Sequence, residues 1–198
     1  TRMLILAHRE ELLDQAAAKL RAVNPSLMVG IEQADRRSGP LDDVVSASVQ
    51  TLTAGGARRL KALDPQTFRI VIVDECHHAR SESYETILNH FSLIPPAAYR
   101  PSARATEDVV NAARERCTQW WRATSADRLL LGVTATPARA DGLGLEWTFE
   151  TIVYEKTLRW MIAGGYLVGP RGYVLNNTAP VLDGIKTVAG HYSIGELA

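Results

Sequence analysis

Cysteine and long apolar runs are both scarce in this sequence, and each scarcity argues against a class of protein. The two cysteines, Cys76 and Cys117, form neither a disulfide framework nor the ligand spacing of a zinc site. We therefore expect a reducing, cytoplasmic setting. No apolar run approaches the roughly 20 residues needed to cross a bilayer. We expect neither a signal peptide nor a membrane partner.

Charge of either sign is also not in excess, because 22 basic residues face 22 acidic ones. Bulk electrostatics therefore argue neither for nor against a nucleic-acid partner. Phosphate contacts would need local clusters of basic side chains rather than a high isoelectric point. With 198 residues, the chain is long enough for one domain with a substantial core.

Short apolar runs alternate with helical patterns along the chain. Strands are expected at residues 3–7, 27–31, 44–48, 68–73, 129–133 and 173–175. Helices are expected at residues 8–23, 83–91, 106–121 and 157–163, with a short helix or turn after residue 48 that Gly55 and Gly56 break. Residues 32–43 and 134–145 are expected to be loops. This alternation predicts an α/β domain with a parallel sheet.

Polar residues follow several of the expected strands directly. They are His8-Arg9, Ser48-Val49-Gln50, Asp74-Glu75 and Thr134. Parallel sheets bind ligands at the carboxyl ends of their strands, so these residues predict an active site at one edge.

The acidic pair Asp74-Glu75 ends the strongly apolar run at residues 68–73. Unpaired charge beside a core is costly, and a bound Mg²⁺ is one reason to place it there. The second carboxylate can then activate a water molecule. The alternative is that the pair caps the following helix. A zinc site built from Cys76, His77 and His78 is a third possibility, although no second cluster completes it.

Four segments in a fixed order resemble motifs Ia, Ib, II and III of superfamily 2 helicases. They are residues 4–12 (LILAHREEL), 45–52 (VSASVQTL), 73–79 (VDECHHA) and 132–137 (GVTATP). The acidic motif is of the D-E-x-H type, similar to DEAD/DEAH-box proteins. Residues 139–142, 155–158 and 165–168 are similar to the bacterial branch that includes type III restriction motor subunits.

The resemblance implies a RecA-like (P-loop NTPase) three-layer domain and an ATP-driven helicase or translocase. Asp74 would hold Mg²⁺ with ATP, Glu75 would activate water, and His77 would couple nucleotide state to neighbouring motifs. Thr134 and Thr136 would link hydrolysis to nucleic-acid binding. Nucleic acid, with DNA favoured by the family likeness, would lie near the following residues: His8, Arg9, Gln50 and Thr51.

One departure from the family is the absence of any Gly-Lys dipeptide, and hence of a G-x-x-x-x-G-K-[ST] phosphate loop. We therefore expect a RecA-like domain incomplete at both ends, over residues 1–170. Residues 171–198 would begin a linker to a second RecA-like domain. The complete protein would hydrolyse ATP and this fragment alone would not. The alternative function is a degenerate module that binds nucleic acid or protein without ATPase activity.

The stretch 95–127 is longer than the family usually has between motifs II and III. It contains Trp120, Trp121 and several arginines. Aromatic and arginine side chains can stack on bases. Paired tryptophans are more often packing anchors, and the sequence favours packing.

Overall fold

A computed structural model describes residues 2–102, 104–125, 127–136, 145–172, 187–188 and 191–192 of the chain. By their internal contacts these form two compact units, Thr1–Val153 and Tyr154–Ala198. The predicted domain boundary at residue 170 stays a prediction. The predicted strand at residues 173–175 lies outside the described residues, as do Pro137 and residues 139–142.

The first unit is built on a five-stranded sheet in which every pairing is parallel, in the order β2-β3-β1-β4-β5. Its strands are β1 (Arg2–Ala7), β2 (Val29–Glu32), β3 (Val44–Ser48), β4 (Phe68–Asp74) and β5 (Leu129–Val133). The α/β, parallel-sheet prediction is therefore confirmed. The central strands β1 and β4 are the apolar runs of the sequence, as expected for strands covered on both faces.

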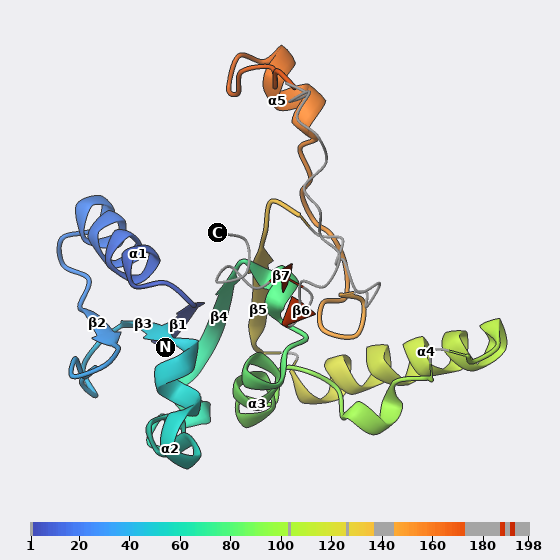
Figure 1. Ribbon diagram of the computed structural model, residues 1–198. Helices are drawn as coiled ribbons and strands as arrows, with labels where there is room; N and C mark the ends of the chain where they lie inside the picture. The colour runs from blue at the N-terminus through green and yellow to red at the C-terminus, as the bar shows by residue number, and fades with distance from the viewer. Residues whose placement is uncertain are drawn as a thin grey trace. The chain divides into compact units, whose positions relative to one another are not determined.

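Helices lie on both faces of this sheet, which gives three layers (Figure 1). The helices of the first unit are α1 (Glu10–Val23), α2 (Val49–Lys61), α3 (Glu82–His90) and α4 (Glu107–Thr124). On one face, Ala17 of α1 is buried beside Ile5 of β1. On the other, α2 and α3 bury Leu52, Ile87 and Leu88 against the sheet. These layers agree with the three-layer, RecA-like prediction.

Two local predictions need correction. Residues 32–43 were expected to be a loop, but Glu32 is the last residue of β2 and is only 4% exposed. The short helix after residue 48 is broken where predicted, since residues 54–57 leave helical geometry, but the helix resumes beyond the kink and ends at Lys61. The sequence missed this second half because its helical spacing is too short to stand out.

The second unit contains one helix, α5 (Leu158–Ala163), and a two-stranded antiparallel pair, β6 (Thr187–Val188) with β7 (His191–Tyr192), among its described residues. Thr157 caps α5, because its hydroxyl accepts a hydrogen bond from the Trp160 amide at 3.2 Å. The helix ends at Ala163, where the sequence predicts its end, and Gly164 caps it. No helix in the described ranges is long and apolar enough to cross a membrane.

The core beneath α3 generates a stability prediction. Phe91 is 1% exposed and meets Phe68 of β4 edge to face, with ring centroids 5.4 Å apart. We expect Phe91→Ala to lower the free energy of unfolding by about 3–5 kcal/mol, because it leaves a cavity against the sheet. Urea denaturation would measure this.

The matched control is Val23→Ala, at a side chain that is 87% exposed. That change should alter the free energy of unfolding by less than about 0.5 kcal/mol. An equal loss in both variants would contradict the assignment of Phe91 to the core.

Candidate nucleotide and nucleic-acid site

Parallel pairing brings the carboxyl ends of β1, β3, β4 and β5 to one edge of the sheet. Within it, Asp74 lies opposite Val133, the last residue of β5. Ala7 lies opposite Ser48 in the pairing of β1 with β3. The residues that follow these strands are therefore neighbours in space, as the sequence predicts.

The acidic pair occupies a sharp turn. Glu75 has φ +49° and ψ 49°, a left-handed conformation that a non-glycine residue adopts at a cost of roughly 1 kcal/mol or more. The amide of Glu75 donates to Oδ1 of Asp74 at 3.0 Å. Both side chains remain partly exposed. The turn thus presents two carboxylates to solvent from the end of a buried strand.

His77 connects this turn to the end of β5. Its Nδ1 lies 3.2 Å from Oε2 of Glu75 and 2.9 Å from Oγ1 of Thr134. Thr134 in turn accepts a hydrogen bond from the amide of Thr136 at 3.2 Å. One imidazole therefore contacts both the predicted general base and the predicted coupling segment.

The negative charge of the acidic turn helps to raise the pKa of two nearby buried side chains, Cys76 and Tyr84. Burial, followed by the charge of Glu75, raises the pKa of Cys76 from 9.0 to about 11. Burial, followed by the charges of Asp74 and Glu75, raises the pKa of Tyr84 on α3 to about 12. Both groups are therefore neutral near pH 7. The sequence did not single out Tyr84, whose position under the turn depends on how α3 packs.

Close packing around Cys76 also explains a glycine in β5. A Cβ atom on Gly132 would lie 2.7 Å from Sγ of Cys76 and 2.6 Å from the Phe149 ring. Only glycine lets β5 approach the acidic turn this closely.

The predicted nucleic-acid residues lie at the ends of β1 and β3. Arg9 is the residue before α1 and is exposed. Ser48 caps α2, since its hydroxyl accepts from the Thr51 amide at 3.3 Å. Gln50 Nε2 donates to the carbonyl of His8 at 3.2 Å, which joins the two segments directly. Sequence reasoning did not name Ser48 as a cap, although serine before a helix is a recognisable signal.

A shallow hollow of about 290 Å³ lies between the α1 start and the acidic turn. His8 and His78 both line it and lie edge to face, with ring centroids 5.5 Å apart. Its lining is His8, Arg9, Leu12, Glu75, His77 and His78. The residues of motifs Ia and II therefore share one concave surface.

The zinc alternative finds no support in the part of the chain that the structure describes. No group of three or more His, Cys, Asp or Glu side chains there is placed to hold a metal ion. Asp74 by itself suits Mg²⁺ better, because Mg²⁺ commonly uses one carboxylate together with phosphates and water.

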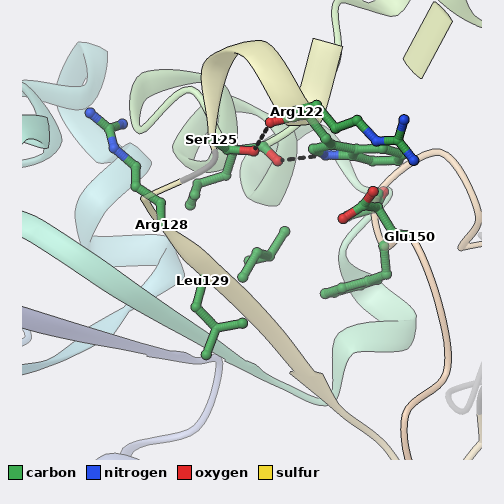
Figure 2. Close-up of a pocket in the computed structure, with 10 residues that line it drawn as sticks. Arg122, Ser125, Arg128, Leu129 and Glu150 are labelled. Atoms are coloured by element: carbon green, nitrogen blue, oxygen red, sulfur yellow. Dashed lines mark hydrogen bonds between the residues drawn. The ribbon is translucent and has the colours of Figure 1, made fainter. Parts of the chain in front are cut away.

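A second cavity, of about 360 Å³, lies beside Leu129 at the amino end of β5, away from the acidic turn (Figure 2). Trp121 lines it and is 8% exposed, with its indole N–H donating to the carbonyl of Leu93 at 3.2 Å. Trp121 thus acts as a packing anchor for α4, which agrees with the packing interpretation for this member of the tryptophan pair.

Comparison with known proteins supports the motif assignment. Residues 1–98 match the family described as type III restriction enzyme, res subunit (ResIII). A protein named as a mitochondrial ATP-dependent helicase, irc3 of Schizosaccharomyces pombe, is 33% identical over 168 residues, covering 85% of this chain and 23% of its own length. A protein named as the ATP-dependent helicase IRC3 of Saccharomyces cerevisiae is 31% identical over 196 residues, covering 98% of this chain and 24% of its own length.

A 51.5 kDa protein of a Lactococcus phage is 27% identical over 162 residues, covering 81% of this chain. The chain spans about a quarter of the length of each of these relatives. The ordered motifs, the parallel sheet and these matches together identify the chain as a first RecA-like domain of the superfamily 2 helicase type, related to the res subunits of type III restriction enzymes.

Proposed function

We propose that the chain is part of an ATP-driven motor that unwinds or translocates along nucleic acid, with DNA as the favoured partner. The observation that carries this proposal is the contact of His77 with both Glu75 and Thr134. It gives a physical path between the acidic turn and the segment that follows β5. A second RecA-like domain, outside this chain, would complete the motor.

The acidic turn would divide its work between two carboxylates. Asp74 would hold Mg²⁺, which supplies charge neutralisation at the phosphates of bound ATP. Glu75 would orient the attacking water and accept its proton. His77, in contact with Glu75, would position that carboxylate. Through its contact with Thr134, it would also couple a change at Glu75 to the segment that contains Thr134 and Thr136.

The ends of β1 and β3 would contact the nucleic-acid backbone. His8, Arg9, Gln50 and Thr51 lie beside one another there, and the Gln50 side chain is bonded to the His8 carbonyl. Contacts of this kind position a strand without reading its sequence. Neighbouring backbone amides at the start of α2 add to the attraction for phosphate.

A reducing compartment such as the cytoplasm suits the two thiols. Cys76 and Cys117 are both buried and free, and burial raises the pKa of each. The S. pombe relative is named as mitochondrial, so the cytoplasmic location rests on the cysteine argument alone.

The assignment of Glu75 predicts a specific loss of activity in the full-length protein. Glu75→Gln should lower the rate of ATP hydrolysis by about 10²–10⁴-fold, because a general base contributes that much. Binding of ATP and of nucleic acid should persist, since the amide keeps the shape of the side chain. Steady-state ATPase assays and equilibrium binding would measure both.

Glu82→Gln is the matched control, at an exposed glutamate in the first turn of α3. Its ATPase rate should equal that of the wild type. A Glu75→Gln variant that hydrolyses ATP as fast as this control would remove Glu75 from the catalytic role.

The missing phosphate loop predicts the behaviour of the 198-residue chain by itself. The purified chain should neither hydrolyse ATP nor show saturable binding of a fluorescent ATP analogue, because no Gly-Lys loop surrounds the phosphates. Circular dichroism would first establish that it is folded. Hydrolysis that disappears in Glu75→Gln would contradict this prediction.

A further inference from the structure

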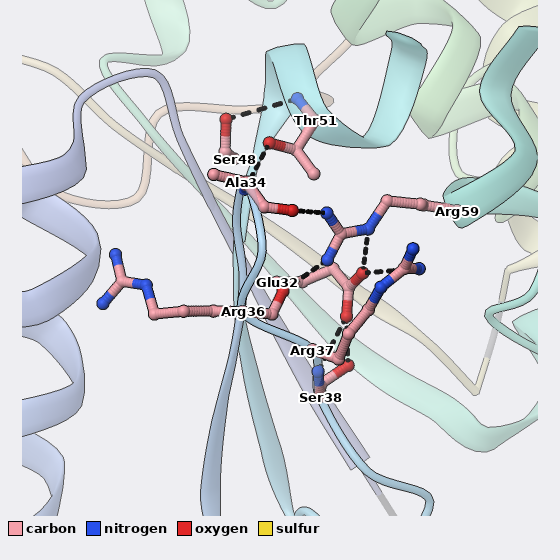
Figure 3. A network of polar contacts seen from close by, with 8 residues as sticks. All are labelled: Glu32, Ala34, Arg36, Arg37, Ser38, Ser48, Thr51 and Arg59. Carbon is pink, nitrogen blue, oxygen red and sulfur yellow. Dashed lines mark hydrogen bonds and ion pairs between the residues drawn. The ribbon is translucent and has the colours of Figure 1, made fainter. Parts of the chain in front are cut away.

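A buried carboxylate holds the first part of the connection between β2 and β3. Residues 33–38 of this connection are here called the 33–38 segment. Glu32 precedes it, with a side chain only 5% exposed. The amide and the hydroxyl of Ser38 both donate to Oε2 of Glu32 at 2.8 Å, and Arg59 of α2 pairs with Oε1 (Figure 3). A charge this deeply buried is stable only when it is fully paired.

Arg59 also fastens the 33–38 segment to α2. Its guanidinium donates to the carbonyl of Ala34 at 2.5 Å and to the carbonyl of Arg36. From the other half of α2, before the kink, Thr51 Oγ1 accepts from the Ala34 amide at 3.3 Å. Both halves of α2 therefore bind the same short segment.

Arg36 extends from this segment in the other direction, to the start of α1. Its guanidinium lies 2.6 Å from Oδ1 of Asp14 and 3.1 Å from Oε1 of Glu10. The hydrogen bond to Asp14 is the main reason that the pKa of Arg36 is raised. Glu10 directly follows Arg9, so this arm ends beside a residue assigned to nucleic acid.

We infer that the 33–38 segment is a brace that sets the distance and orientation between Arg9 and the Gln50-Thr51 pair. Arg36 and Arg59 are then positioning residues for nucleic-acid binding. This inference rests on the proposed function, because it concerns the same nucleic-acid surface. Two backbone contacts bind one strand best when their spacing is set before the strand arrives. The hydrogen bond from Gln50 Nε2 to the His8 carbonyl is one link between the two contact points, and the brace supplies a second.

Two other roles for Arg36 make different predictions. If Arg36 contacted a phosphate directly, its partners Glu10 and Asp14 would compete with that phosphate. Removing the two acids would then strengthen binding. If the arm only stabilised the fold, none of these changes would alter the nucleic-acid concentration that the enzyme requires. The brace predicts that removing Arg36, or removing its partners Glu10 and Asp14, changes nucleic-acid binding to the same extent.

The test uses the full-length protein and measures nucleic-acid-stimulated ATP hydrolysis. The readouts are kcat at saturating nucleic acid and the nucleic-acid concentration at half-maximal rate, or KM. Arg36→Ala and the double variant Glu10→Gln, Asp14→Asn should each raise KM by roughly threefold to fivefold, the upper part of the range of an exposed ion pair. In both, kcat should stay within about twofold of wild type. The triple variant should be no worse than either, because all three changes break one interaction.

The matched control is Arg69→Ala, since Arg69 also forms a surface ion pair, with Asp127, but at the amino end of β4. Its KM should equal that of wild type. Arg36 is the better test than Arg59, because Arg59→Ala would remove the closest ion pair of the buried Glu32 and is expected to destabilise the domain.

Opposite shifts in KM for Arg36→Ala and the double acidic variant would overturn the brace in favour of direct phosphate contact. In that case the salt dependence of binding should also weaken for Arg36→Ala alone. Unchanged KM in all variants would overturn it in favour of simple stabilisation. If nucleic acid does not change the rate of ATP hydrolysis by the wild-type protein, the proposed function is overturned, and the brace with it.

Discussion

The pairing of β4 between β1 and β5 is the constraint on which the rest of this domain depends. In a parallel sheet all carboxyl ends lie at one edge, so the register of β4 decides which residues of distant segments meet. Asp74 lies opposite Val133, and immediately beyond them His77 contacts both Glu75 and Thr134. A slip of one residue would turn Asp74 to the other face and separate these groups.

Charge is used in two different ways at this edge. Glu32 is nearly inaccessible and saturated by Arg59 and Ser38, which suits a carboxylate whose work is to hold the chain. Asp74 and Glu75 stay partly exposed and bond little beyond their own turn. Carboxylates that must exchange water, metal and substrate need that access, whereas a structural one does not. Exposure thus separates the two acids proposed for catalysis from the acid proposed to brace the chain, although all three lie at the carboxyl ends of strands.

The five strands of the sheet and the start of its site could be predicted from the sequence because apolar runs and the residues after them are local signals. Asp74, Glu75, His77 and Thr134 lie in short motifs of this kind. The role of Glu32 could not be predicted, since its partner Arg59 is 27 residues away and nothing local marks the pair. The hidden second half of α2 has the same cause, because contacts with the 33–38 segment, rather than helical periodicity, hold Arg59 in place. Long-range side-chain pairs, unlike the burial of strands, produce no periodic pattern in the sequence.

The backbone conformation of Glu75 favours the proposed motor over a degenerate binding module. Glu75 is held at φ +49°, where glycine or asparagine would be less costly. Strained non-glycine residues persist where their surroundings fix them, and they cluster at functional sites. A module that only bound nucleic acid through Arg9 and Gln50 would gain nothing from a carboxylate in this conformation. In the proposed motor, this conformation lets Glu75 contact His77 at 3.2 Å from the end of β4 while its carboxylate stays partly exposed, as a general base would require.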